Sequence, residues 1–249
     1  MAGHNKWSKV KHIKAVVDAK RGKVFSKLAK EISLAAKHGG GNPDTNARLR
    51  TAILAARAQN VPNDNIERAI KKGTGELGGA AIEEIVYEAY APGGTALMIE
   101  VVTDNRNRAA ADIRSLLIKN NGTFADAGSV AYMFQRRGEI RVNGAGLSED
   151  QITELALEAG ADDFVQEGDE WVLYTATDQL FAVGSVLREK GVTPTSQKLI
   201  YQPGNTITIS DPEIARKVTS LFDVLDDYDD SQNVYANFDL TDEAAASLE

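Results

Sequence analysis

Apolar positions recur at helical spacing in three successive segments near the beginning of the chain. The first segment runs from about residue 20 to the glycines at 39–41, the second from about 44 to 59, and the third from about 63 to 73. The side chains expected on the three inner faces are Val24, Phe25, Leu28, Ile32, Ala35 and Ala36, then Leu49, Ala52, Ile53 and Ala56, then Ile66 and Ile70. Asn63 or Asp64 is expected to cap the third helix. The pattern predicts a three-helix domain over residues 1–79.

Runs rich in β-branched and aromatic residues follow the helices and predict a first αβ domain. Its expected elements are strands at 85–90 and 96–103, a helix at 106–119 and, far along the chain, a helix at 211–225 and a strand at 233–239. The two early strands are joined across Pro92, Gly93 and Gly94, which is a hairpin signal. We expect the late strand to complete the same sheet, so that residues 80–129 plus 202–249 form one domain.

The segment between these two halves has the element order of a ferredoxin-like unit. The elements expected are strands at 130–134 and 139–142, a helix at 148–159, strands at 163–166 and 171–175, a helix at 178–190, and a strand at 193–201. We therefore predict an α+β multidomain fold: an N-terminal three-helix domain followed by two αβ domains. The ferredoxin-like domain, residues 130–201, is inserted into the other one.

Composition narrows the class of protein. The 249 residues are 43% hydrophobic and 26% charged, which is ordinary for a soluble globular chain. There is no cysteine, which excludes disulfides, zinc-cysteine sites and thiol catalysis and favours a reducing compartment. No stretch approaches the roughly 20 apolar residues needed to span a bilayer, and no secretory signal opens the sequence. We expect a cytoplasmic protein with no membrane partner.

The net charge of −8 conceals a strong asymmetry. Residues 1–79 contain 16 Lys and Arg against 6 Asp and Glu, a net charge of +10. The remaining 170 residues contain 12 against 30, a net charge of −18. A cationic first third on an acidic chain predicts that the helical domain is the part that attracts a polyanion such as nucleic acid.

Basic residues form two stripes and an arm in this region. Lys20, Lys23, Lys27, Lys30 and Lys37 lie within an arc of about 100° on the first helix. A second stripe lies on the third helix, and Trp7 in the N-terminal arm either stacks on a base or anchors the arm to the domain. The residues predicted to contact nucleic acid are Lys6, Trp7, Lys9, Lys11, Lys14, Lys20, Arg21, Lys23, Lys27, Lys30, Arg68, Lys71, Lys72, Arg106 and Arg108.

Two of these, Arg106 and Arg108, belong to the segment Asp104-Asn105-Arg106-Asn107-Arg108. Asp104 or Asn105 there can simply cap the following helix, or the arginines and amides can bind phosphate or a base edge. The acidic run from Asp226 to Asp230 lacks the glycine turn and terminal glutamate of an EF-hand loop. We interpret that run as a solvated acidic loop.

No arrangement of residues in the sequence indicates an enzyme. There is no P-loop, no HExxH pair and no G-x-S-x-G elbow, and the three histidines lie among lysines. The glycines at 73, 75 and 78 match G-x-G-x-x-G, but they follow a helix where the dinucleotide motif must follow a strand. We expect no catalytic residues, no metal site, no cofactor and no small-molecule substrate.

Five segments carry a distinctive combination of motifs: AGHNKW at 2–7, DAKRGK at 18–23, PNDNIERAIKKG at 62–73, TDNRNR at 103–108 and QNVYANFD at 232–239. With them the chain resembles, over nearly its whole length, the YebC/PmpR family. That family comprises proteins described as probable transcriptional regulators and includes mitochondrial translational activators of cytochrome oxidase subunit I. The resemblance implies three domains, one αβ domain inserted into another, and gene regulation without catalysis.

Two functions remain open from the sequence. The family resemblance implies a DNA-binding transcriptional regulator that acts through the basic domain. The alternative is a ribosome-associated translation factor that binds rRNA or tRNA and relieves stalled translation, a role that the family resemblance also implies. A cationic arm with acidic domains suits a surface of rRNA and basic ribosomal proteins. No helix combines a base-reading set of Arg, Asn and Gln with flanking lysines, which favours recognition of backbone or shape. We favour a monomer.

Overall fold

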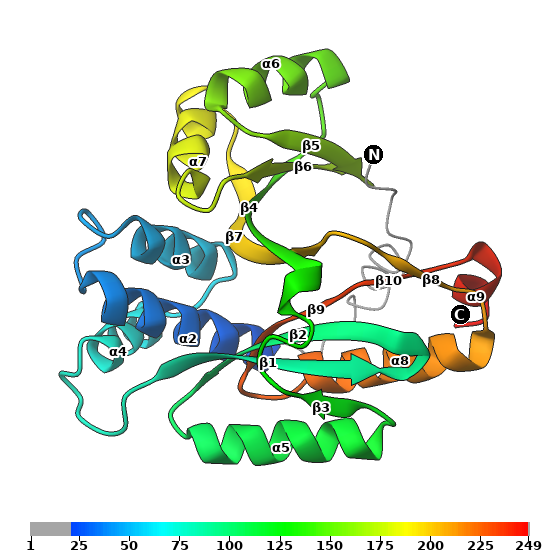
Figure 1. The fold of residues 1–249 in the computed structure, drawn as a ribbon. Coiled ribbons are helices and arrows are strands. Elements are labelled where there is room, and N and C mark those ends of the chain that lie inside the picture. The colour runs from blue at the N-terminus through cyan, green and yellow to red at the C-terminus, as the bar shows by residue number, and fades with distance from the viewer. Residues whose placement is uncertain (1–20, 249) are drawn as a thin grey trace. The chain divides into compact units, whose positions relative to one another are not determined.

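The computed structural model describes residues 21–248, which divide into two units. One unit is residues 135–202, and the other combines the chain before and after it. Figure 1 shows the helices and strands of both units. Among the described residues no helix combines the length and apolar character needed to cross a bilayer.

The larger unit begins with the three predicted helices. They are α2 (Arg21–Gly39), α3 (Ala47–Ala58) and α4 (Asn63–Gly73). Their shared core is Ile32, Ala35, Ala36, Leu49, Ala52, Ile53, Ala56, Val61, Ile66 and Ala69. Asn46 caps α3 by accepting from the Leu49 N–H at 3.0 Å, and it also donates to the Ala35 carbonyl at 2.8 Å, which ties α3 to α2. The cap predicted for α4 is wrong, because the helix starts after Pro62 with no side-chain hydrogen bond.

Helix α2 has a second covered face, which the sequence pattern did not indicate. Leu34 is completely buried on the side away from the three-helix core and packs with Ile82 and Val102. The Lys37 ammonium donates to the Ile82 carbonyl at 2.6 Å on the same side. Val24, expected on the inner face, is 37% exposed. Helix α2 therefore lies between its two partner helices and the αβ domain.

The αβ domain is built from two segments of the chain, one before and one after the smaller unit. The first segment contains β1 (Glu83–Ala91), η2 (Pro92–Gly94), β2 (Thr95–Thr103), α5 (Arg106–Lys119) and β3 (Thr123–Ala125). The second contains β8 (Ile207–Ile209), α8 (Pro212–Asp226), β9 (Ser231–Ala236), β10 (Phe238–Leu240) and α9 (Asp242–Ala246). The main sheet has the order β3-β1-β2-β9, so the late strand does complete the early hairpin. Helices α5 and α8 cover one face of this sheet (Figure 1).

The strand expected at 233–239 is broken in the structure at Asn237. The Asn237 side chain accepts from the Ala96 N–H at 2.7 Å, and its carbonyl accepts from the Ile207 N–H at 2.7 Å. These bonds turn the chain out of the main sheet, so that β10 pairs with β8 in a separate parallel ladder. The strand therefore ends at Asn237, which accepts hydrogen bonds from backbone N–H groups of two other segments, although the alternation of apolar residues alone would continue the strand.

The smaller unit has the predicted ferredoxin-like order. Its elements are β4 (Phe134–Asn143), α6 (Glu149–Ala159), β5 (Asp163–Glu167), β6 (Glu170–Thr175), α7 (Leu180–Glu189) and β7 (Pro194–Pro203). The sheet order is β5-β6-β4-β7, and its core includes Ile140, Ile152, Leu173 and Leu187. A predicted strand at 130–134 is wrong, since Ala131–Met133 forms the short helix η3 before β4.

The physical reason for that difference is Glu88, a buried residue of β1. Its carboxylate accepts hydrogen bonds from the backbone N–H groups of Gly128, Val130 and Ala131 at 2.6, 2.6 and 3.0 Å. Those donors are therefore not available to a strand ladder. Burial disfavours the ionised carboxylate, but the three hydrogen bonds outweigh it and lower the pKa of Glu88.

Candidate nucleic-acid interface

Several residues predicted to bind nucleic acid lie outside the described part of the chain. They are Lys6, Trp7, Lys9, Lys11, Lys14 and Lys20. Arg21 begins α2, but its side chain also lies outside the description. The geometry of the site is therefore built from α2, α4 and the start of α5.

The lysine stripe of α2 is not a freely exposed surface. Lys23 lies 3.3 Å from the Asp227 carboxylate, Lys27 lies 3.1 Å from Asp226, and Lys30 lies 2.7 Å from Asp230. The exposed fractions of the lysine side chains are 43%, 27% and 19% along the helix. Of the predicted stripe, Lys23, Lys27 and Lys30 thus lie in a row along α2, each paired with an acid of another domain.

The lysines also bind the end of α8 through its main chain. Lys23 donates to the Asp227 carbonyl and Lys27 to the Asp226 carbonyl, both at 3.1 Å, and Lys30 donates to the Asp229 carbonyl. The last carbonyls of a helix lack partners within the helix and carry the negative end of its dipole. Helix α8 has no basic residue in its own last turn. Lys23 and Lys27 of α2 supply that positive charge instead, and Lys30 binds the chain just beyond the end of the helix.

The acidic run is only in part the solvated loop expected from its composition, because Asp227 and Asp229 are exposed but Asp230 is buried. The Asp230 side chain is only 10% exposed, and its carboxylate accepts from Arg108 and from Thr103, each at 2.8 Å, besides Lys30. Burial opposes ionisation, but the hydrogen bonds from Lys30, Arg108 and Thr103 outweigh it and lower the pKa of Asp230 to about 2. Asp230 therefore anchors α2 to β2 and α5.

The segment 104–108 divides into a structural part and an open part. Asn105 caps α5 by accepting from the Arg108 N–H at 3.0 Å. The Arg108 guanidinium bonds to Asp230 and to Asp104, at 2.8 and 3.2 Å. Arg106 is exposed, and its carbonyl accepts from the Tyr87 hydroxyl at 3.3 Å. Of the two predicted arginines, Arg106 presents its charge to solvent, while Arg108 is held by carboxylates.

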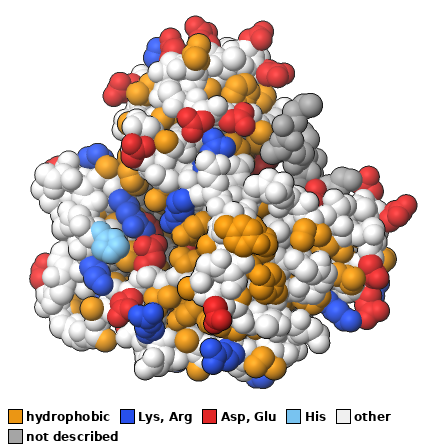
Figure 2. All heavy atoms as spheres, in the orientation of Figure 1, with side chains coloured by type: hydrophobic (Ala, Val, Ile, Leu, Met, Phe, Trp, Pro, Cys, Tyr) orange, Lys and Arg blue, Asp and Glu red, His pale blue; other side chains and the backbone are white. Residues whose placement is uncertain are grey.

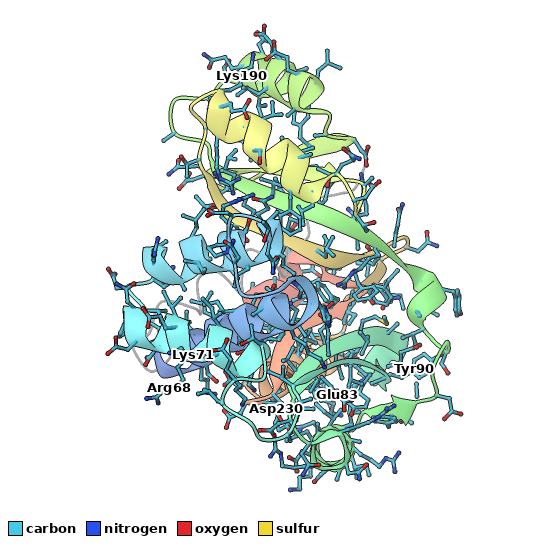
Figure 3. All side chains as sticks on the ribbon, turned by 90° about the vertical axis from the view of Figure 1, so that its left-hand side faces the viewer. Arg68, Lys71, Glu83, Tyr90, Lys190 and Asp230 are labelled. Carbon is cyan, nitrogen blue, oxygen red and sulfur yellow. The ribbon has the colours of Figure 1, made fainter. Side chains whose placement is uncertain are left out.

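Helix α4 carries three exposed cations of the predicted set. Arg68, Lys71 and Lys72 are all exposed, at helical spacing that puts them on one side of the helix. Lys72 lies 3.9 Å from Asp104, whereas neither Arg68 nor Lys71 has an ion-pair partner among residues 21–248. Figure 3 shows Arg68 and Lys71 on α4, directed away from the rest of the unit.

The surface of the unit mixes both charges, as Figure 2 shows over α2, α3 and α4, where basic and acidic side chains alternate. Within residues 21–248, no group of three or more His, Cys, Asp or Glu side chains could hold a metal ion. Because the cations of α4 are exposed, they are suited to contact with an external anion, whereas Lys23, Lys27 and Lys30 of α2 already contact carboxylates of the same chain.

The acids that contact α2 were missed as functional partners from sequence. The signal that could have identified them is charge complementarity between the acidic run and the lysine stripe. Asp226, Asp227 and Asp230 follow directly on a helix that lacks a basic last turn, and the lysine stripe has few acids of its own. Pairing the two requires knowledge that residues about 200 positions apart are neighbours, which periodicity does not supply.

Comparison with known proteins places these features in a family context. Residues 5–76 match the family model described as the TACO1/YebC protein N-terminal domain, and residues 82–238 match the one described as the TACO1/YebC second and third domain. The chain is 55% identical over 251 residues to a protein of Akkermansia muciniphila named "Probable transcriptional regulatory protein", covering 100% of both chains. A protein of Fervidobacterium nodosum with the same name is 51% identical over 243 residues, covering 97% of this chain and 95% of that one.

The fold also matches a solved structure. A conserved hypothetical protein from Aquifex aeolicus has a crystal structure with a TM-score of 0.87 and 44% sequence identity. The match covers 92% of this chain and 94% of that one. The similarity thus extends over both described units of the chain.

Proposed function

The chain belongs to the TACO1/YebC family, and from that premise we propose that it is a nucleic-acid-binding regulator of gene expression, in the first place a DNA-binding transcriptional regulator. Relatives that match over their full length carry the name of probable transcriptional regulatory proteins. The proposed role is regulatory and not catalytic, and its proposed place is the cytoplasm.

The observation that carries this proposal is the outer face of α4. Arg68 and Lys71 present positive charge to solvent without a carboxylate partner among the described residues, in a domain whose net charge is +10. Phosphate groups of a nucleic acid are the ligands that such a face attracts, because each contact releases condensed counterions. Arg106 is a further exposed cation of the proposed contact surface.

The chemistry of this face suits backbone contact and not base reading. Lysine is a point charge that binds phosphate oxygens, and an arginine in a row with lysines serves the same purpose. The proposed binding therefore depends on phosphate spacing and on the shape of the nucleic acid. Structured RNA on the ribosome fits the same description, so the translation-factor reading is tested in parallel.

The test is a titration of the full chain and of Arg68→Gln with Lys71→Gln against a short duplex DNA and an RNA hairpin at several salt concentrations. We expect the variant to bind more weakly, with a log-log salt slope on duplex DNA smaller by about 2, since each phosphate contact contributes about 0.9. Lys119→Gln with Lys217→Gln removes the same charge from exposed positions of the αβ domain and should have little effect.

Three outcomes separate the alternatives. Equal losses of affinity in the Arg68/Lys71 and Lys119/Lys217 double variants would show that only net charge matters and would contradict a binding surface on α4. Tighter binding to the RNA hairpin than to duplex DNA would move the assignment to the translation factor. Absence of binding by the unaltered chain to either probe, at low salt, would overturn nucleic-acid binding itself.

A further inference from the structure

The contact between α2 and the segment Asp226–Asp230 resembles a bound polyanion in its chemistry. Each of the three lysines meets one carboxylate oxygen and one main-chain carbonyl oxygen of the segment. An ammonium that binds two adjacent oxygens on a chain of negative groups makes the same set of contacts with a phosphodiester backbone. We call Asp226–Asp230 the acidic segment.

The three ion pairs differ in how accessible they are. Side-chain exposure falls from 43% and 49% for Lys23 and Asp227, through 27% and 25% for Lys27 and Asp226, to 19% and 10% for Lys30 and Asp230. Exposed pairs contribute little free energy and exchange readily with solvent ions. The contact is therefore weakest at the N-terminal end of α2 and strongest at Lys30.

The third pair has additional contacts with α5 and β2. Asp230 also accepts hydrogen bonds from Arg108 and Thr103, so its position is set by α5 and β2 independently of α2. Leu34, one helical turn beyond Lys30, is buried against Ile82 and Val102. Opening the contact at Lys23 and Lys27 leaves these interactions in place, whereas opening it at Lys30 would break them.

We propose that the acidic segment is an internal competitor for nucleic acid, which covers Lys23 and Lys27 in the free protein and is displaced there by phosphates when nucleic acid binds. This inference rests on the proposed function and adds the regulation of its binding surface. The ion pair between Lys30 and Asp230 remains intact and keeps α2 attached to the αβ domain while the other two pairs open. Binding begins on the exposed face of α4 and extends to α2 only after the carboxylates of Asp226 and Asp227 have left.

The consequence is that the full chain binds nucleic acid less tightly than its lysines alone would allow. Part of the binding free energy is spent on breaking two internal ion pairs. Removing the charge of the competitor should therefore strengthen binding, which is the opposite of what a merely structural contact would do.

The first experiment compares the full chain with Asp226→Asn plus Asp227→Asn, in titrations against duplex DNA and an RNA hairpin. We expect affinity to rise about three- to tenfold at low salt, as follows from losing two partly exposed pairs. The control is Asp169→Asn plus Asp178→Asn, which makes the same change in charge at exposed positions of the smaller unit. The control should bind like the unaltered chain.

The second experiment adds Lys23→Gln and Lys27→Gln to the Asp226→Asn, Asp227→Asn variant. The gain in affinity should disappear, because the freed lysines are its proposed source. In parallel, the rate of acylation of Lys23 and Lys27 by an amine-reactive ester, followed by mass spectrometry, should increase in the variant that lacks the two acids. The acylation rate of Lys71, which has no partner among the described residues, should not change.

The outcomes distinguish this inference from the function on which it rests. If the unaltered chain binds but the two acid pairs change affinity equally, repulsion by net charge explains the effect and the competitor is refuted. If the gain persists without Lys23 and Lys27, or if their acylation is as fast in the unaltered chain, the covering is refuted while the proposed function stands. If neither the unaltered chain nor any variant binds either probe, both the proposed function and the competitor are refuted.

Discussion

The carboxylate of Asp230 accepts hydrogen bonds from three different elements of the larger unit. Lys30 comes from α2, Thr103 from the end of β2 and Arg108 from α5. Such a buried group is stabilising only while all its partners remain, since an unpaired charge in the interior is costly. Asp230 is thus the residue that makes the position of α2 depend on that of α5.

Asp230→Asn should lower the free energy of unfolding by about 2–3 kcal/mol at neutral pH, because two cations lose their common carboxylate. The pKa of Asp230 in the folded chain, about 2, lies below the unfolded value of about 3.9. Its contribution is therefore present above pH 4 and is lost as the pH falls towards 2. Urea unfolding between pH 7 and 2 should show the two proteins converging; Asp229→Asn, at an exposed neighbour, should match the unaltered chain throughout.

Glu88→Gln tests the second buried carboxylate. A glutamine has one acceptor oxygen for three backbone donors, so we expect a loss of about 1–3 kcal/mol at neutral pH. Because the folded pKa of Glu88 is lowered, the deficit should shrink as the pH falls below the unfolded value of about 4.3. Glu83→Gln on the same strand is exposed and serves as the control. A deficit that is constant with pH would show that the carboxylate charge is irrelevant.

At the scale of elements, α2 shows what periodicity predicts and what it omits. Its inner face was predicted well, since Ile32, Ala35 and Ala36 do form the core with α3 and α4. The burial of Leu34 was not, because one leucine among polar neighbours makes no stripe, and its partners Ile82 and Val102 lie in another domain. Sequence pattern identifies the face that packs within a domain; a face that packs between domains needs the tertiary structure.

Leu34→Ala should destabilise the chain by about 2–4 kcal/mol, the usual cost of a cavity in place of a fully buried leucine. Leu54→Ala is the matched control, because Leu54 is on α3 of the same domain and is 47% exposed. Chemical denaturation of both variants gives the comparison. Equal, small effects would mean that the second face of α2 contributes no packing energy.

At the scale of the whole molecule, the order of the elements could be predicted because two of the three cores are each made from one continuous segment of sequence. The core of the helices lies between Ile32 and Ala69, that of the inserted unit between Ile140 and Leu187, and neither borrows from the other. The candidate site was predicted less completely. The exposed cations of α4 follow from their spacing, but the acids on α2 follow only from contacts across about 200 residues.

The inserted unit enters and leaves through neighbouring strands. The Gly204 N–H donates to the Met133 carbonyl at 2.8 Å, and β4 and β7 lie side by side. Replacing residues 135–202 by a short Gly-Ser linker should leave both other cores folded, since no residue of them comes from this range. Thermal unfolding should remain cooperative, and nucleic-acid titrations should be unchanged within about twofold, a difference of roughly 0.4 kcal/mol. Loss of cooperative unfolding would show that the insertion supports its host.

The large sequence separation of the lysine–aspartate pairs also means that the ribosome makes the lysines well before their partners. Lys23, Lys27 and Lys30 precede their acidic partners by about 200 residues. At synthesis rates of about 5–20 residues per second, the helices exist for roughly 10–40 s before Asp226 is made. During that interval every newborn copy has an uncovered row of lysines, next to the ribosome that is making it. Each new molecule therefore has these lysines uncovered at first, and they can be covered only after α8 and residues 227–230 have been made.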